Sequence, residues 1–162
     1  RAANDAAATD VAATDEQADT GLRTLRGTIR ARGANQREYL SSVFRWIEEK
    51  APHSTIHCIG FSQGVATIMR CIGHQGVLPA SLLAWAGSWP PDLDKTNRAA
   101  LNALTFKAWF GTQDEYINTE KQEQMVTHYR EKYNFEPMVG IYGGGHSFDA
   151  EKLAREITAL EK

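Results

Sequence analysis

TIHCIGFSQG, at residues 55–64, begins with an apolar run of high β-propensity at residues 55–59. This run leads into two glycines that flank a serine. Apolar residues then recur at helical spacing over residues 65–72, so we predict a strand, a tight turn and a helix. The pattern G-x-S-x-G in this setting is typical of a nucleophile elbow, which presents Ser62 at the apex of a strained turn. We expect a Cβ at Gly60 or Gly64 to collide with the neighbouring strand or helix. The alternative is a glycine-rich turn whose serine only caps the helix.

An activated serine needs a base that removes its proton and an acid that orients the base. Three further strand-like runs follow the serine, at residues 81–86, 104–110 and 138–142. Asp114 comes just after the second of these runs, and His146 comes just after the third. The carboxyl ends of parallel strands form the site in open α/β sheets. The chain order Ser62, Asp114, His146 is the α/β-hydrolase order and differs from both major serine-protease orders.

Each partner of the serine also has a simpler interpretation. Asp114 suits an ordinary loop, and Glu115 beside it is a weaker rival for the same role. His146 alone could be a surface histidine. The other histidines lack a comparable setting at a strand end: His53, His57, His74 and His128. Because the three candidates fall in the expected order at three strand ends, we predict Ser62, Asp114 and His146 as the catalytic set.

Four segments resemble the phospholipase/carboxylesterase family of the α/β-hydrolase superfamily: GFSQG (60–64), WAGSWPP (85–91), GTQDEY (111–116) and GH (145–146). This family includes acyl-protein thioesterases and many predicted bacterial esterases, and the resemblance covers about residues 36–162. It implies a serine hydrolase that cleaves carboxylic esters or thioesters without a metal or an organic cofactor. Ser62 would be the nucleophile, with Asp114 orienting the general base His146. The backbone amide of Gln63 would be one oxyanion donor. One small departure is Val65, where many relatives have a smaller residue.

The beginning of the chain departs further from the family pattern, which has several strands and a second oxyanion donor before the elbow. Residues 1–20 are mainly Ala, Asp and Thr, and we expect this low-complexity segment to be disordered. Residues 21–35 place Leu and Ile among arginines, which suits a short basic amphipathic helix. We therefore expect residues 1–35 to be a tail or a remnant segment, and residues 36–162 to be a partial catalytic core.

These patterns predict an α/β fold with a mainly parallel sheet of about four strands flanked by helices. The resemblance implies that it is the C-terminal part of an α/β-hydrolase fold. In such a partial sheet the strand before the elbow has an open outer edge, which favours pairing with another chain. Either another polypeptide covers this edge, for example a second copy in self-association, or the partial fold is unstable or altered. The alternative function is a catalytically impaired fragment that acts as a binding or assembly module.

Composition narrows the remaining function classes. The chain has 162 residues, of which 42% are hydrophobic, and its net charge of −2 disfavours a nucleic-acid partner. No apolar run approaches the length of a membrane span, and no Cys or His spacing is typical of a metal site. Cys58 and Cys71 are interpreted as buried free thiols of a cytoplasmic protein, with a disulfide between them as the alternative. The expected partner is a small-molecule ester or thioester.

Helical periodicity also places several elements around the sheet. We predict helices over residues 37–50 and 149–160, and a third from Thr119 to about Tyr133. Thr119 and Gln122 have the spacing of a capping box that opens this third helix.

We expect the loop after the run at 81–86 to form one wall of a substrate pocket. Trp89, beside the prolines at 90–91, is the leading candidate, and Phe61 and Tyr116 are weaker candidates for substrate binding. The alternative places Trp85 in the core and leaves Trp89 as a surface aromatic held by rigid prolines.

Overall fold

The structure of the chain is a computed structural model that describes residues 35–73 and 78–160. Backbone contacts divide the chain into Arg1–Gln36 and Arg37–Lys162, and the description below concerns the second of these units. The tail and the basic helix expected before residue 35 lie outside the described residues.

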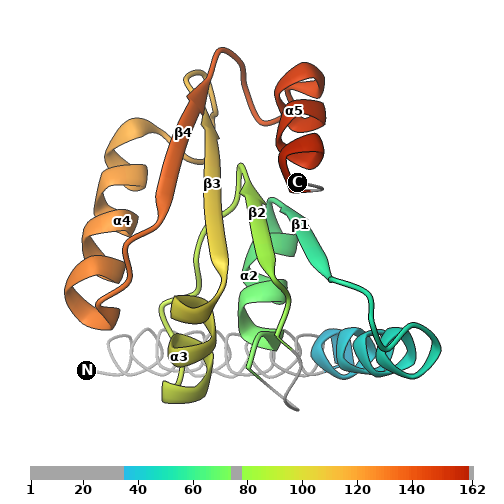
Figure 1. The fold of residues 1–162 in the computed structure, drawn as a ribbon. Coiled ribbons are helices and arrows are strands. Elements are labelled where there is room, and N and C mark those ends of the chain that lie inside the picture. Colours follow the sequence, from blue (N-terminus) through green and yellow to red (C-terminus); the bar gives the residue numbers. More distant parts are fainter. Residues whose placement is uncertain (1–34, 74–77, 161–162) are drawn as a thin grey trace, which may run out of the picture. The chain divides into compact units, whose positions relative to one another are not determined.

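Four parallel strands form the sheet: β1 (His57–Phe61), β2 (Ser81–Trp85), β3 (Thr105–Gly111) and β4 (Met138–Tyr142). Their order across the sheet is β1-β2-β3-β4, and Figure 1 shows them side by side. Gly60 lies opposite Ala84, which in turn lies opposite Ala108, so β1 and β2 end at the same level and β3 continues beyond them to Gly111. The prediction of a parallel α/β sheet of about four strands is confirmed. Among the described residues, β1 and β4 are the edge strands.

Helices alternate with these strands along the chain: α2 (Gln63–Cys71), α3 (Lys95–Ala103), α4 (Thr119–Tyr133) and α5 (Ala150–Leu160). Residues 37–50 are also helical, as predicted. Asp94 caps α3 by accepting a hydrogen bond from the backbone N–H of Asn97 at 2.9 Å. Asn134 ends α4 in a left-handed conformation with φ of 49°.

The start of α4 corrects the predicted capping box. The N-cap is Asn118, whose side-chain oxygen accepts from the backbone N–H of Lys121 at 3.0 Å. Gln122 is buried, and its side-chain amide donates to the carbonyl of Ile117 at 3.0 Å. Thr119 is thus the first helical residue rather than the cap, because an asparagine one position earlier already satisfies the free N–H.

The two faces of the sheet carry different apolar clusters, because successive strand residues point to opposite faces. One face packs against helical residues such as Phe44, Val65, Leu101 and Tyr129, and it holds most of the core. The other face carries Trp85 and Tyr142, against which Phe61, Trp109 and Leu153 of α5 pack. The helices around the first face fix the positions of the strand ends on which the candidate site lies.

Two further expectations concern membrane-spanning helices and the state of the two cysteines. Within residues 35–73 and 78–160, no helix has the length and apolar character that a membrane crossing requires. Cys58 and Cys71 are buried and free, as interpreted from the sequence. Burial raises the pKa of the Cys58 thiol to about 11, with a smaller contribution from Cys71, so this thiol is neutral near pH 7.

Candidate active site

Ser62 lies in the sharp turn between β1 and α2. Its φ of 51° and ψ of −123° place a non-glycine residue in a sparsely populated region, which is the strain expected of a nucleophile elbow. A Cβ on Gly60 would lie 2.9 Å from the Cα of Val65, so that glycine is required for the close approach of β1 and α2. The Ser62 side chain makes no capping hydrogen bond to α2, which disagrees with the interpretation of Ser62 as a simple cap.

The expectation for Gly64 is wrong, because a Cβ built there meets no atom within 4 Å. The second tight position is Gly87, in the loop after β2. A Cβ on Gly87 would lie 2.6 Å from the carbonyl oxygen of Ser62 and would overlap the side chain of Val65. The close packing that supports the turn therefore comes from a loop distant in sequence. A spacing pattern confined to residues 60–64 could not reveal it.

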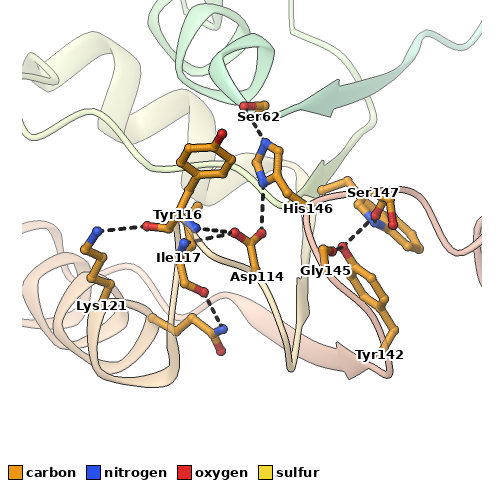
Figure 2. Close-up of polar contacts among 11 residues, drawn as sticks. Ser62, Asp114, Tyr116, Ile117, Lys121, Tyr142, Gly145, His146 and Ser147 are labelled. Atoms are coloured by element: carbon orange, nitrogen blue, oxygen red, sulfur yellow. Dashed lines mark hydrogen bonds and ion pairs between the residues drawn. The ribbon is translucent and has the colours of Figure 1, made fainter.

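The structure brings the three predicted side chains together (Figure 2). The Nε2 atom of His146 lies 2.9 Å from the Oγ atom of Ser62, and its Nδ1 atom lies 2.9 Å from Oδ2 of Asp114. Ser62 follows β1, Asp114 follows β3 and His146 follows β4. The three residues thus meet at the carboxyl edge of the sheet, where parallel strands end together.

Hydrogen bonds keep the buried carboxylate of Asp114 ionised. Burial by itself would raise its pKa, but hydrogen bonds from His146 and from the backbone N–H groups of Ile117 and Tyr116 outweigh burial and lower the pKa. The two N–H groups donate to Oδ1 at 2.8 Å from Tyr116 and 3.0 Å from Ile117. Because an ionised carboxylate can only accept, the Nδ1 atom of His146 must carry the proton. Its Nε2 atom is then the acceptor for the hydroxyl of Ser62.

Neighbouring groups hold the loop that carries His146. The hydroxyl of Tyr142 donates to the carbonyl of Ser147 at 2.6 Å, and the indole N–H of Trp85 donates to the same carbonyl at 3.0 Å. The rings of Phe61 and Tyr116 lie 5.0 and 4.8 Å from the imidazole, measured between ring centroids. These contacts restrict the imidazole to one orientation.

A cavity of about 590 Å³ opens beside the Ser62 hydroxyl. Its walls are formed by Ser62, Gln63, Ala86, Ser88, Tyr116, Ile117, Lys121, Met125 and His146. Gln63 is the first residue of α2, so its backbone N–H belongs to the group that a helix leaves without an intrahelical partner. This N–H is adjacent to the nucleophile and lies at the positive end of the helix dipole.

The predicted substrate-binding residues divide into three cases. Tyr116 is exposed and lines the cavity. Phe61 contacts the ring of His146 but is not among the lining residues. Trp89 corrects the sequence interpretation: it is buried among Phe106 and other core aromatic rings and forms no part of the cavity wall. Neither a pocket wall nor a surface position therefore describes Trp89. Trp85 lies in the core, as the alternative interpretation of this loop predicted.

Five further residues line the cavity that the sequence did not predict there: Ala86, Ser88, Ile117, Lys121 and Met125. Lys121 and Met125 occupy adjacent turns of α4, and no local pattern indicated which helix would border the serine. Within the described part of the chain, no three His, Cys, Asp or Glu side chains gather as a metal site would require.

Comparisons with known proteins place this arrangement in a known fold. No family model and no curated protein sequence matches the chain. Among solved structures, it is similar to Zea mays acyl-protein thioesterase 2, with 13% identity and a TM-score of 0.62 over 80% of this chain and 64% of that one. Esterase PE8 matches with 15% identity and a TM-score of 0.61, over 80% of this chain and 60% of the esterase.

An α/β serine hydrolase homologue from Coxiella burnetii matches with 24% identity and a TM-score of 0.56. This match covers 77% of the chain and 57% of the Coxiella protein. The chain therefore has an α/β-hydrolase fold of the kind seen in these thioesterase and esterase structures, and it spans about three fifths of their length.

Proposed function

We propose that this chain is a serine hydrolase that cleaves carboxylic esters or thioesters through an acyl-enzyme. One observation carries the proposal: the continuous pair of 2.9 Å contacts from Ser62 through His146 to Asp114. A serine, a base and a buried acid in this relation are the recurring arrangement for acyl transfer. The hydrolase fold of the structural neighbours supports the same reaction class.

In the first half of the reaction, the Nε2 atom of His146 removes the proton of Ser62 as its oxygen attacks the carbonyl carbon of the substrate. The carbonyl oxygen becomes negatively charged, and it accepts a hydrogen bond from the backbone N–H of Gln63. His146 then gives its proton to the leaving alcohol or thiol, the bond to that group breaks, and the acyl group remains on Ser62.

In the second half, a water molecule replaces the leaving group. His146 removes one proton from this water, and the resulting oxygen nucleophile attacks the acyl carbon. The bond to the Ser62 oxygen then breaks, and His146 returns the proton to that oxygen, which releases the carboxylic acid and restores the starting enzyme. In both halves Asp114 holds the imidazole in the Nδ1-protonated form and stabilises its positive charge.

The cavity supports a substrate of small-molecule size, because its volume lies in the range of about 300–1,000 Å³ that such sites occupy. Ala86, Ile117 and Met125 give it an apolar wall suited to an acyl chain, while Ser88 and Lys121 add polar groups. We assign one oxyanion donor, the amide of Gln63. Enzymes with this elbow use a second amide from another loop, and one such donor is worth about 10²–10³ in rate.

Labelling with a fluorophosphonate tests the proposal directly, because this reagent reacts with a serine that a neighbouring base activates. We expect stoichiometric labelling of Ser62, and loss of labelling in Ser62→Ala. The matched control is Ser88→Ala, which removes a second serine from the wall of the same cavity. A folded wild-type protein that takes up no reagent would contradict the proposal. Nitrophenyl esters of increasing chain length, assayed beside acyl thioesters, would then separate esterase from thioesterase activity.

A second candidate function is binding or assembly through the outer edge of β1. The observation that favours it is the place of this strand at the end of the described sheet, with Ile59 41% exposed. An unpaired apolar edge is a template for pairing with another strand. Light scattering over a concentration series tests for self-association, which Ile59→Lys should abolish. A monomer at all concentrations would exclude self-association through this edge.

The proposed cellular location is the cytoplasm. The buried free thiols of Cys58 and Cys71 support it, because reduced cysteines persist in that compartment. Measuring the distribution of the protein between cell fractions would test this proposal.

A further inference from the structure

We infer that Gln122 and Lys121 of α4 are positioning residues that hold the turn carrying Asp114 in its active geometry. The inference rests on the proposed function, since it concerns how the acid of the catalytic set is oriented. Neither side chain contacts Ser62 or His146 in the hydrogen bonds of the site, so both would act through Asp114.

Four hydrogen bonds fix Tyr116 and Ile117, the two residues that hold the Asp114 carboxylate. Their N–H groups donate to Oδ1 of Asp114 at 2.8 and 3.0 Å. Their carbonyl groups accept from α4: Nζ of Lys121 donates to Tyr116 at 2.8 Å, and Nε2 of Gln122 donates to Ile117 at 3.0 Å. Figure 2 shows Lys121 reaching toward the Tyr116 carbonyl while Asp114 lies between this turn and His146.

Neither side chain caps α4. Asn118 already caps the helix, so Gln122 has no capping function. Lys121 lies in the first turn, where a positive charge opposes the helix dipole. The two side chains are thus explained by their contacts with the Asp114 turn, and Gln122 makes its contact from a buried position.

Removing the Gln122 amide would leave the carbonyl of Ile117 without its partner in a buried environment. The turn would relax to find another donor, which would move the N–H groups that hold Oδ1 of Asp114. Because Oδ2 of the same carboxylate contacts His146, a shift of the turn is transmitted to the imidazole. A misplacement of about 1 Å can lower a catalysed rate by about 10²-fold.

The exposure of the two side chains ranks their effects. Gln122 is 6% exposed, so water cannot replace its hydrogen bond to the carbonyl. Lys121 is exposed, and water can partly take its place at Tyr116. We therefore expect about a tenfold to hundredfold loss of kcat in Gln122→Met, and about a twofold to fivefold loss in Lys121→Met. KM should change little in Gln122→Met, since Gln122 does not line the cavity.

The test compares these variants with Tyr129→Phe. This control removes one buried hydrogen bond from the same helix, the bond between the Tyr129 hydroxyl and the Pro90 carbonyl, without touching the Asp114 turn. Four quantities are measured for each protein: the melting temperature, kcat and KM with a nitrophenyl ester, and the NMR signal of the His146 Nδ1 proton. We expect Gln122→Met to lose kcat and to shift or broaden that signal. Tyr129→Phe should lower only the melting temperature.

The outcomes separate this inference from the proposed function. An active wild-type protein with an unchanged kcat and an unchanged Nδ1 signal in Gln122→Met overturns the inference and leaves the function standing. If Gln122→Met does not fold, Lys121→Met decides through the Nδ1 signal, because Lys121 also lines the cavity and its rate can change through substrate contacts. An unchanged signal there overturns the inference. An inactive wild-type protein whose Nδ1 signal is lost in Gln122→Met contradicts the function but supports the positioning of Asp114.

Discussion

The indole N–H of Trp85 donates to the carbonyl of Ser147 at 3.0 Å, across 62 positions of the sequence. The bond joins the end of β2, in the middle of the sheet, to the residue that follows His146. Trp85 is completely buried, so this contact ties the loop that carries the imidazole to the core of the fold. The same carbonyl accepts from the hydroxyl of Tyr142 at 2.6 Å. The His146 loop is therefore held by aromatic side chains from two strands.

Replacing Trp85 should affect both stability and rate. We expect Trp85→Phe to lower the free energy of unfolding by about 1–3 kcal/mol, because it removes buried volume and leaves the Ser147 carbonyl with one donor fewer. The labelling rate of Ser62 by a fluorophosphonate should fall as the loop loosens. Chemical denaturation and the labelling time course measure the two effects. A labelling rate equal to that of the wild type would show that Tyr142 alone is sufficient to hold the loop.

Gly87 and Gly64 form a matched pair for testing the packing of the elbow. A Cβ on Gly87 would press on the Ser62 carbonyl and the Val65 side chain, so we expect Gly87→Ala to cost about 1–3 kcal/mol of stability. The added Cβ of Gly64→Ala meets no atom within 4 Å, and alanine is a better helix former at the start of α2. The free energy of unfolding should therefore stay equal or rise by up to about 1 kcal/mol. Denaturant unfolding of both variants checks the ranking. Equal losses would contradict the packing described for the loop after β2.

Asp114→Asn should reduce hydrolysis far more than it reduces binding. The amide can donate to the imidazole and favour the wrong tautomer, so we expect kcat to fall by about 10⁴-fold while KM changes little. Steady-state kinetics with a nitrophenyl ester measures this change. A loss below tenfold would indicate that another acid, such as the neighbouring Glu115, replaces Asp114.

The lowered pKa of Asp114 also predicts a pH dependence of stability. A carboxyl whose pKa is lower in the folded than in the unfolded chain binds fewer protons when folded, so it stabilises the fold at higher pH. This stabilisation is fully present above the unfolded value of about 3.9 and is lost as the pH falls through the lowered folded value. Comparison of unfolding free energies between pH 7 and pH 2 should show a steeper acid loss for the wild type than for Asp114→Asn. Parallel curves would refute the assignment.

Cys58 should resist thiol reagents in the folded protein. With a pKa raised to about 11 by burial, roughly one molecule in ten thousand carries the reactive thiolate at pH 7. We expect iodoacetamide to modify Cys58 only as fast as the chain opens, and two equivalents to react after unfolding without a reductant. Mass spectrometry counts the modified thiols. Failure to modify the unfolded protein would favour the disulfide between Cys58 and Cys71.

Most elements of the fold could be predicted from local patterns, but the helix α3 was not predicted. The apolar run before Ser62 and the helical spacing after it each depend on residues close in sequence, and the same holds for α4 and α5. Chain order along a parallel sheet also brought Ser62, Asp114 and His146 to one edge, because every strand of such a sheet ends there. These predictions needed no knowledge of distances between side chains.

The cavity wall could not be predicted in the same way. Trp89 was expected at the pocket because it follows a strand end, but its ring fills core space left by Phe106 and Tyr129. Lys121 and Met125 border the serine because α4 packs beside the loop that carries Asp114. Which side chain fills a given volume depends on the shapes of several distant segments, and a periodic pattern carries no information about those shapes.

The sequence by itself determined the turn at Ser62, the strands and helices other than α3, and the order of the three candidate catalytic residues. These follow from glycine placement, hydrophobic period and chain direction, all of which act locally. Only the tertiary structure decided the 2.9 Å contacts of His146, the need for glycine at position 87 rather than 64, and the contact of Gln122 with the Asp114 turn. Each of these depends on close packing between residues far apart in the chain, and packing acts over a few ångströms in space regardless of separation in sequence.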